Sequence, residues 1–263
     1  MRTLVLLVIL LAMGLPAVAA QAPTLHMTYL GNMGVLLEGG ETRIVIDGFH
    51  RGELPEYAAV PAQILAPLEQ GRPPYGSLTA ALTTHRHKDH YDPRSVLARL
   101  RADRIMVYGA AGETMDSLLS FRGQLPAPER IRAMKVGGDP EQLLAPGIVA
   151  LDLPHNPTPS KRVANVGFLV EVGGLRVLHV GDADPTEGNF ARHRLAARQI
   201  DVAFVPFWYL TGDDDKVRRA IGARTWVATH VPPADSSTIR EQVRRIMPTA
   251  VVLVRPGEER RLQ

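Results

Sequence analysis

Three short segments near the start of the chain, residues 25–30, 35–38 and 42–46, have the apolar and β-branched character of strands, and glycine-rich turns separate them. Short segments of this kind bounded by glycine predict strands, and short turns between such strands predict hairpins. We therefore expect the fold to open with an antiparallel meander. A proline-rich connection at residues 60–76 follows it.

The remainder of the chain predicts strands that alternate with helices. Continuous apolar runs predict strands at residues 78–84, 104–108, 148–153, 166–172, 175–180, 202–207 and 226–229, and helical spacing predicts helices at residues 113–120, 190–198, 215–221 and 237–246. A further helix is expected to follow Asp92-Pro93, because aspartate caps helices and proline favours their first position. Thr238 and Glu241 have the spacing of a capping box. With no repeat or dividing linker visible, we expect one domain over residues 21–263.

Composition places the chain among ordinary globular proteins. Of its 263 residues, 45% are hydrophobic, and the formal net charge is only +3. The basic residues are scattered among acidic ones without a run of five like charges, so a nucleic-acid partner is not expected. Cysteine is absent, which excludes disulfides.

The first twenty residues have the pattern of an export signal. Arg2 precedes a short apolar run, Gly14 and Pro16 break it, and small residues suited to cleavage follow at positions 17–20. This pattern predicts a periplasmic or secreted protein without stable membrane insertion after cleavage. An uncleaved anchor is the alternative reading of the same segment.

Candidate metal ligands are concentrated in the run His85-Arg86-His87-Lys88-Asp89-His90. Imidazole nitrogens and carboxylate oxygens together suit Zn²⁺. In an extended loop His85 and His87 share a face, so both can bind one metal, while a turn at Lys88 directs Asp89 and His90 toward a second. The alternative is a solvated loop whose histidines only cap the following helix.

This run resembles the H-x-H-x-D-H signature of the metallo-β-lactamase superfamily, and further landmarks follow the family's order. Asp47 is similar to an early aspartate that orders the metal-binding loop. His155 resembles the third histidine of the first metal, Asp182 the carboxylate that bridges both metals, and His230 the last ligand of the second. The resemblance implies an α/β fold, a four-layer αβ/βα sandwich. The segments at residues 29–32 and 165–168 look most like the branch that includes L-ascorbate-6-phosphate lactonase.

Other polar and aromatic residues receive plainer interpretations. Four histidines are expected to be structural, namely His26, His50, His179 and His193, although His50 lies on a loop that can also face the pocket. Asp184 is read as part of a surface turn. Trp208 and Tyr209 are equally compatible with a pocket wall and with core packing, and so is Tyr91.

The resemblance implies a hydrolase with two divalent metal ions, zinc first, with manganese or iron as alternatives. Two such ions can share a hydroxide at neutral pH, and Asp89 is the expected catalytic residue that orients it and passes a proton to the leaving group. Lactam-cleaving relatives replace the bridging carboxylate with Cys or Ser, so Asp182 disfavours that activity. The expected substrate is a small ester, lactone or phosphodiester.

Two other functions remain open at this point. One is a metal-binding or sensing protein that keeps the site without turnover, and the other is an iron redox protein with the same ligands. The sequence does not choose between lactone, ester and phosphodiester, and it leaves the oligomeric state open.

Overall fold

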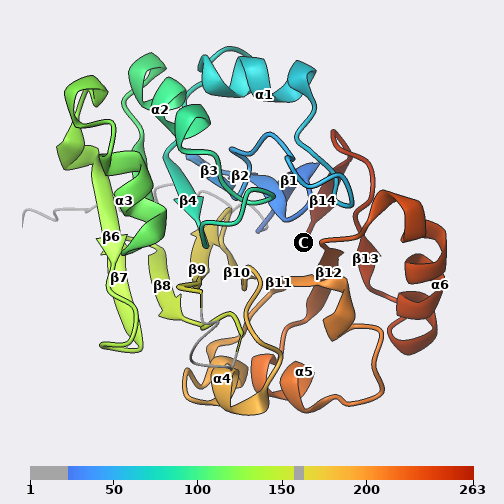
Figure 1. Cartoon of the computed structure of the whole chain (residues 1–263). Coiled ribbons are helices and arrows are strands. Elements are labelled where there is room, and N and C mark those ends of the chain that lie inside the picture. Colours follow the sequence, from blue (N-terminus) through green and yellow to red (C-terminus); the bar gives the residue numbers. More distant parts are fainter. Residues whose placement is uncertain (1–22, 157–162) are drawn as a thin grey trace, which may run out of the picture.

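The computed structural model describes residues 23–156 and 163–263 of the chain. Two seven-stranded sheets pack face to face, and helices cover the outer face of each sheet (Figure 1). The expected four-layer αβ/βα sandwich is therefore confirmed. The expected export signal at residues 1–20 lies outside the described residues.

The first sheet combines the expected meander with parallel strands. Its strands, in spatial order, are β14 (Glu259–Leu262), β1 (Leu25–Gly31), β2 (Gly34–Gly39), β3 (Thr42–Ile46), β4 (Ala80–Thr83), β5 (Met106–Ala110) and β6 (Ile131–Met134). The first three along the chain pair antiparallel, and β3 to β6 pair parallel. Its outer face packs against α1 (Ala62–Glu69), α2 (Pro93–Ala102) and α3 (Glu113–Leu119).

The second sheet has the same mixed character. Its strands, in spatial order, are β13 (Val251–Val252), β12 (Thr225–Thr229), β11 (Val202–Pro206), β10 (Leu175–His179), β9 (Val166–Val172), β8 (Ile148–Asp152) and β7 (Glu141–Ala145). Strands β10 to β13 pair parallel, and β7 to β10 pair antiparallel. Its outer face packs against α4 (Glu187–Ala191), α5 (Lys216–Ile221) and α6 (Ser236–Ile246).

Strand alternation divides the apolar side chains of β1 between two cores. Leu25, Met27 and Tyr29 face the second sheet, where they join side chains such as Phe168, while Leu30 lies in the layer under the helices. Both cores are fully buried, which fixes the register of the strands because a slip by one residue would exchange the two faces. The strands therefore present their ends at defined positions.

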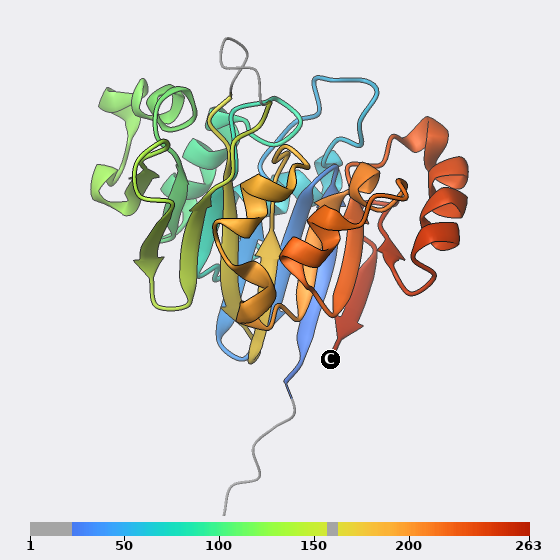
Figure 2. The same cartoon turned by 90° about the horizontal axis from the view of Figure 1, so that it is seen from below.

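The carboxyl ends of β3, β4, β10 and β12 lie at the same end of the sandwich. In Figure 2 the strands run upright, and the loops that follow β3 and β4 lie at the end opposite the C-terminus. Ligands of open α/β sheets commonly bind beyond the carboxyl ends of parallel strands. Each candidate metal ligand follows one of these strands or β8.

Several predicted elements differ from the structure. The helix predicted at residues 190–198 is wrong, because α4 ends at Ala191 and a short 3-10 turn, Leu195–Arg198, follows a left-handed Arg194. The capping box is also wrong, since α6 begins at Ser236 and has no side-chain cap. The proline-rich connection contains α1, which was not predicted. None of the helices in residues 23–156 and 163–263 is long and apolar enough to cross a membrane.

Candidate metal centre

The histidine-rich run forms a tight loop between β4 and α2. The backbone N–H groups of His90 and Tyr91 both donate to the carbonyl of His87, each at 3.0 Å, so the loop turns back where the sequence predicted a turn. Asp92 ends the loop as the N-cap of α2, and its side chain accepts from the backbone N–H of Arg94 at 2.8 Å. The loop is thereby held at both ends.

His85 and His87 of this loop form a first group of four donors with His155 and Asp182, and their ligand atoms all lie within 4.8 Å of one another. The Nε2 atom of His85 is 3.0 Å from Nδ1 of His87. Burial lowers the pKa of His85 well below 6.5, and it also lowers the pKa values of His87 and His155. These imidazoles are therefore neutral at neutral pH, and their lone pairs are available to a cation.

A second group of three donors adjoins the first: Asp89, His90 and His230, again within 4.8 Å of one another. The Oδ2 atom of Asp182 connects the two groups. It lies 3.4 Å from Nε2 of His90 and 3.2 Å from Nε2 of His230. It is also 3.8 Å from Nε2 of His85. One carboxylate thus faces donors from both groups, and its role as a bridge between two metals stays a prediction.

Charges of opposite sign in the second group shift one another's pKa values. Burial alone would lower the pKa of His230, but the carboxylates of Asp182 and Asp89 raise it to about 9. Against the same burial effect, Asp182 and Asp47 raise the pKa of His90 well above 6.5. Conversely, His90 and His230 overcome burial and hold the pKa of Asp182 well below 3.8. In the metal-free chain, protons on these imidazoles occupy the place that a cation would take.

The donor set fits divalent metal ions. In the described part of the chain, Oδ1 of Asp182 and Nδ1 of His230 are buried without a hydrogen-bond partner. Buried polar atoms without partners are rare in folded proteins, because their desolvation is uncompensated. Coordination to a cation would satisfy such atoms, and five imidazoles with two carboxylates match the ligands that zinc prefers.

Residues behind the donors fix their orientation. Asp47 accepts from the backbone N–H of Thr84 at 2.8 Å and from its hydroxyl at 2.7 Å, and it lies 2.9 Å from Nδ1 of His90. The other nitrogen of His90, Nε2, therefore points toward Asp182. The side-chain amide of Asn32 donates to Oδ2 of Asp89 at 2.9 Å, and the backbone carbonyl of Asn32 accepts from the backbone N–H of His230.

The backbone is strained at three of these positions. Asn32, Asp47 and His230 have positive φ values of 47°, 49° and 58°. Non-glycine residues adopt this left-handed conformation at an energetic cost, and such residues cluster at functional sites. Asn32 was not predicted as a site residue, since its role depends on contacts with residues far away in the sequence.

Two aromatic rings border His230. The ring of Tyr57 lies 4.3 Å from that of His230 in an edge-on contact, and the ring of Trp208 lies at 5.0 Å. Both aromatic residues are half-buried. Tyr57 was missed because no local pattern marks it. Tyr209 and Tyr91 are buried in the core instead, which resolves their two possible interpretations.

The four other histidines lie outside both donor groups, as expected: His26, His50, His179 and His193. His50 is fully buried, and its Nε2 atom lies 3.3 Å from the carbonyl of Gly31. Burial and the nearby His90 lower the pKa of His50 to about 4. Asp184 is likewise in neither group. The two groups therefore contain the same seven residues that the sequence analysis named as metal ligands. Their function as metal ligands stays a prediction.

Comparison with protein-family models shows which superfamily the chain belongs to. The family described as beta-lactamase superfamily domain matches residues 42–254. The chain belongs to this superfamily. The matched region contains all seven donors and Asp47, and it leaves out β1, β2, Asn32 and β14.

One curated relative and two solved structures are similar to this superfamily member over most of its length. A UPF0173 metal-dependent hydrolase from Symbiobacterium thermophilum is 26% identical over 248 residues, which cover 89% of this chain and 98% of the relative. The structure of Igni18, a metallo hydrolase from Ignicoccus hospitalis, matches with a TM-score of 0.61 at 19% identity over 91% of this chain and 99% of that one. A possible metal-dependent hydrolase from Veillonella parvula matches with a TM-score of 0.60 at 18% identity over 89% and 98%.

Family, fold and donor groups together identify a metal-dependent hydrolase of the metallo-β-lactamase fold. The two low-identity structures support the fold alone. The sequence analysis expected this enzyme class, and that expectation is confirmed at this level.

Proposed function

We propose that the chain is a two-metal hydrolase that cleaves a small ester, lactone or phosphodiester. The observation that carries this proposal is the contact of one oxygen, Oδ2 of Asp182, with donors of both groups. A carboxylate in that position suits a pair of cations, because it can neutralise charge on both at once. Zinc is the proposed metal, with manganese or iron as alternatives.

The seven donors would form two sets, one for each cation. His85, His87, His155 and Asp182 would hold one cation, and Asp89, His90 and His230 would hold the second with Asp182 shared. When bound, the pair would supply a water nucleophile at neutral pH and polarise the bond under attack. Asp89 is held in place by Asn32, and His230 and His90 lower its pKa against the effect of burial. It is therefore an anionic acceptor that can orient the nucleophile and relay its proton.

The residues around His230 limit the range of substrates that we expect. Tyr57 and Trp208 supply apolar ring surface beside this donor. A substrate with an apolar group next to the bond that is cleaved would gain contact area there. Lactones and aryl or alkyl esters meet this requirement, which agrees with the resemblance to the lactonase branch. The carboxylate of Asp182 disfavours a β-lactam substrate.

A panel of substrates tests the proposal. The metal-loaded protein is assayed with aryl esters, lactones and bis-(p-nitrophenyl) phosphate, once with zinc and once with manganese, and kcat/KM is compared. We expect turnover of at least one class, loss of turnover on chelation and its return on adding metal. Failure to hydrolyse any of the three classes with two metals bound would overturn the proposal.

Asp89→Ala tests the assignment of the catalytic residue. It removes both a donor and the proposed proton acceptor, so kcat should fall by at least about 100-fold, the usual scale for a general acid or base, and bound metal should fall toward one ion per chain. Asp213→Ala is the control, since Asp213 is exposed and lies outside both groups. Full activity and two metals in Asp89→Ala would contradict the assignment.

The proposal includes the cellular location of the enzyme. The export pattern at residues 1–20 supports a periplasmic or secreted enzyme, which acts on a small molecule and has neither a nucleic-acid partner nor a stable membrane insertion. Fractionation of cells that express the full chain, followed by mass determination of the mature N-terminus, tests this point.

A further inference from the structure

A small cleft lies at the side of the sandwich, between α6 and the edge strands of the two sheets. It encloses about 260 Å³ and contains none of the seven donors. Figures 1 and 2 both show α6 beside β13 and β14 at this side. Its lining residues are Arg240, Arg244, Ala250, Val251, Val252, Arg255, Glu258 and Arg260.

The charges that line this arginine cleft are unbalanced. Four guanidinium groups face one carboxylate, and that carboxylate, Glu258, forms an ion pair with Arg260. Arg240, Arg244 and Arg255 form no ion pair or side-chain hydrogen bond with any residue in the described part of the chain. Arg240 is half-buried and the other three arginines are exposed, so the cleft presents its positive charge to solvent.

Some arginines elsewhere in the fold are paired with carboxylates, as Arg198 is with Glu141 and Arg224 is with Asp201. The arginine cleft instead combines three uncompensated cations with a floor of Ala250, Val251 and Val252, which offers no carboxylate to any of them.

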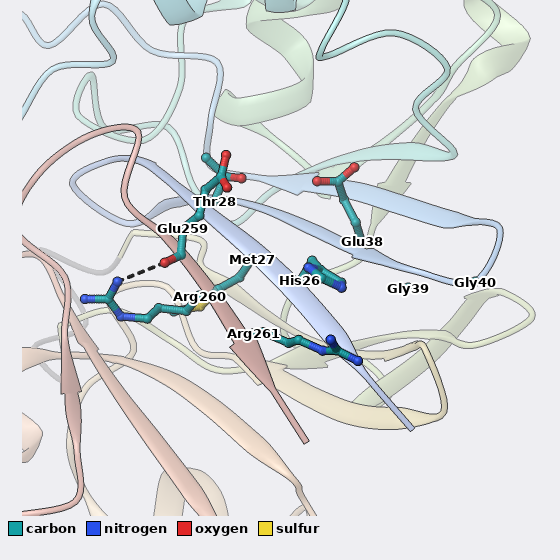
Figure 3. A pocket seen from close by; sticks show the side chains of 9 residues that line it. All are labelled: His26, Met27, Thr28, Glu38, Gly39, Gly40, Glu259, Arg260 and Arg261. Carbon is teal, nitrogen blue, oxygen red and sulfur yellow. Dashed lines mark hydrogen bonds between the residues drawn. The ribbon is translucent and has the colours of Figure 1, made fainter. Parts of the chain in front are cut away.

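The larger hollow drawn in Figure 3 makes the contrast clear. It encloses about 520 Å³ over β14, β1 and β2, it is lined by two arginines, two glutamates and His26 among others, and it shares Arg260 with the arginine cleft. Its two arginines and two glutamates have a formal net charge of zero, so it favours neither anions nor cations. The arginine cleft, with four arginines and one glutamate, has a larger excess of positive charge than this hollow.

We propose that the arginine cleft binds an oxyanion of the phosphate type, either on a free small molecule or on a lipid head group. Guanidinium groups donate paired hydrogen bonds that match tetrahedral oxyanions, and such charge-assisted bonds are the strong ones. The cleft is smaller than the pockets that enclose whole drug-sized ligands, so it suits the anionic group rather than an entire large molecule. This site is separate from the metal centre, and it does not depend on the proposed hydrolytic function.

Side-chain NMR of the metal-loaded full chain tests binding at the cleft itself. Inorganic phosphate is titrated while the Nε–Hε resonances of the arginines are followed, which separates the cleft from any phosphate bound at the metals. The resonances of Arg240, Arg244 and Arg255 should shift together and saturate with one Kd. Arg244→Gln should weaken that Kd by about tenfold, the scale of one charge-assisted hydrogen bond.

A matched control is available on the same helix. Arg245→Gln removes the same charge from α6. Arg245 is exposed, as Arg244 is, but it is not among the lining residues, so the Kd should change by less than about twofold, as expected for a screened surface charge outside the cleft. Equal weakening by both variants, or shifts of similar size at arginines over the whole surface without saturation, would overturn the proposal.

Sedimentation with vesicles then separates the two sources of the anion. Vesicles of phosphatidylcholine are compared with vesicles that also contain phosphatidylglycerol. Sedimentation that requires both the anionic lipid and Arg244 assigns the cleft to a lipid head group. Saturable phosphate binding without sedimentation assigns it to a free phosphate compound.

Discussion

Asp47 determines which ring nitrogen of His90 faces the other donors. It accepts two hydrogen bonds from Thr84 and lies 2.9 Å from Nδ1 of His90, so Nε2 of that ring is left for a metal. Carboxylates that hold ligand imidazoles in this way raise the basicity of the ligand and fix its tautomer. The strength of metal binding therefore depends on a residue that does not itself belong to either donor group.

Asp47→Asn should weaken metal binding without unfolding the protein. The amide keeps the size of the side chain but loses the charge that holds His90, so we expect metal affinity to fall by roughly 10 to 100-fold. Competition with a chromophoric chelator measures this affinity. Thr84→Ser, which keeps the hydroxyl that Asp47 accepts from, should bind metal as the parent does. Unchanged affinity in Asp47→Asn would show that Asp47 is not needed for orientation.

His230 gives the metal-free protein a distinctive dependence on pH. Its pKa is raised from 6.5 to about 9 by Asp182 and Asp89 against the effect of burial. A raised pKa means that the folded state binds the proton more tightly, so this stabilisation is complete below pH 6.5 and is lost as the pH rises through 9. Urea unfolding of the metal-free protein should therefore show stability that decreases from pH 6.5 to pH 9.

Matched histidine variants isolate this effect. His230→Gln should flatten the decrease, whereas His26→Gln should leave it unchanged, because His26 is exposed and lies outside both donor groups. A decrease of the same size in His230→Gln would assign it to another group, such as His90. With metal bound, the imidazole gives its proton to solvent, and the decrease should disappear.

The seven donors could be predicted from the sequence. Four of them lie within residues 85–90, and the other three, His155, Asp182 and His230, follow the order of the family's landmarks. The structure brings these residues together in two adjoining groups. Asn32 and Tyr57 could not be found in this way. Their roles arise from long-range folding, and an asparagine or tyrosine in a loop has many ordinary explanations.

At the scale of elements, Gly181 allows the sharp turn that positions Asp182 after the end of β10. Its φ is +59°, and a Cβ atom there would lie 2.4 Å from Oδ1 of Asn165 and 2.7 Å from Cβ of Thr84. Only glycine fits this turn without displacing the neighbours that support the loop. The chain can therefore turn sharply after the strand and present Asp182 to both donor groups.

Gly181→Ala should destabilise the protein by roughly 2 kcal/mol or more, since a left-handed conformation and a steric clash combine. It should also weaken metal binding, because Asp182 must move. Gly212→Ala is the control, as nothing lies within 4 Å of a Cβ atom there. Urea unfolding and metal titration measure both effects. Equal unfolding midpoints for the two variants would contradict the role given to Gly181.

Element boundaries were predicted well where periodicity was strong and poorly where the tertiary structure overrides it. The predicted helix at residues 113–120 agrees with α3, Glu113–Leu119, within one residue. The helix predicted at residues 190–198 fails at His193, whose ring is buried against the carbonyl of Asp152, so the chain bends there to bury it. Strand β13 has only two residues, too few for a visible pattern.

At the scale of the whole molecule, the metal centre joins the two sheets. His85, His87, Asp89 and His90 follow β4 of the first sheet, whereas His155, Asp182 and His230 follow strands of the second. Apolar packing between the sheets is the main support of this fold, and no disulfide assists it. A metal held by donors from both sheets would add a link at the end of the sandwich where the loops meet.

Metal removal should therefore lower the melting temperature of the whole chain. A ligand that binds only the folded state at about 100 times its Kd stabilises it by about 2.7 kcal/mol, which for a protein of this size corresponds to roughly 5 to 10 °C. Calorimetry of zinc-loaded and chelator-treated protein measures the shift, with metal content followed by elemental analysis. His155→Ala should reduce the shift because it removes the second sheet's imidazole from the first group, and His26→Ala should keep it. Identical melting temperatures with and without two bound metals would mean that the sheets are held together by apolar packing alone.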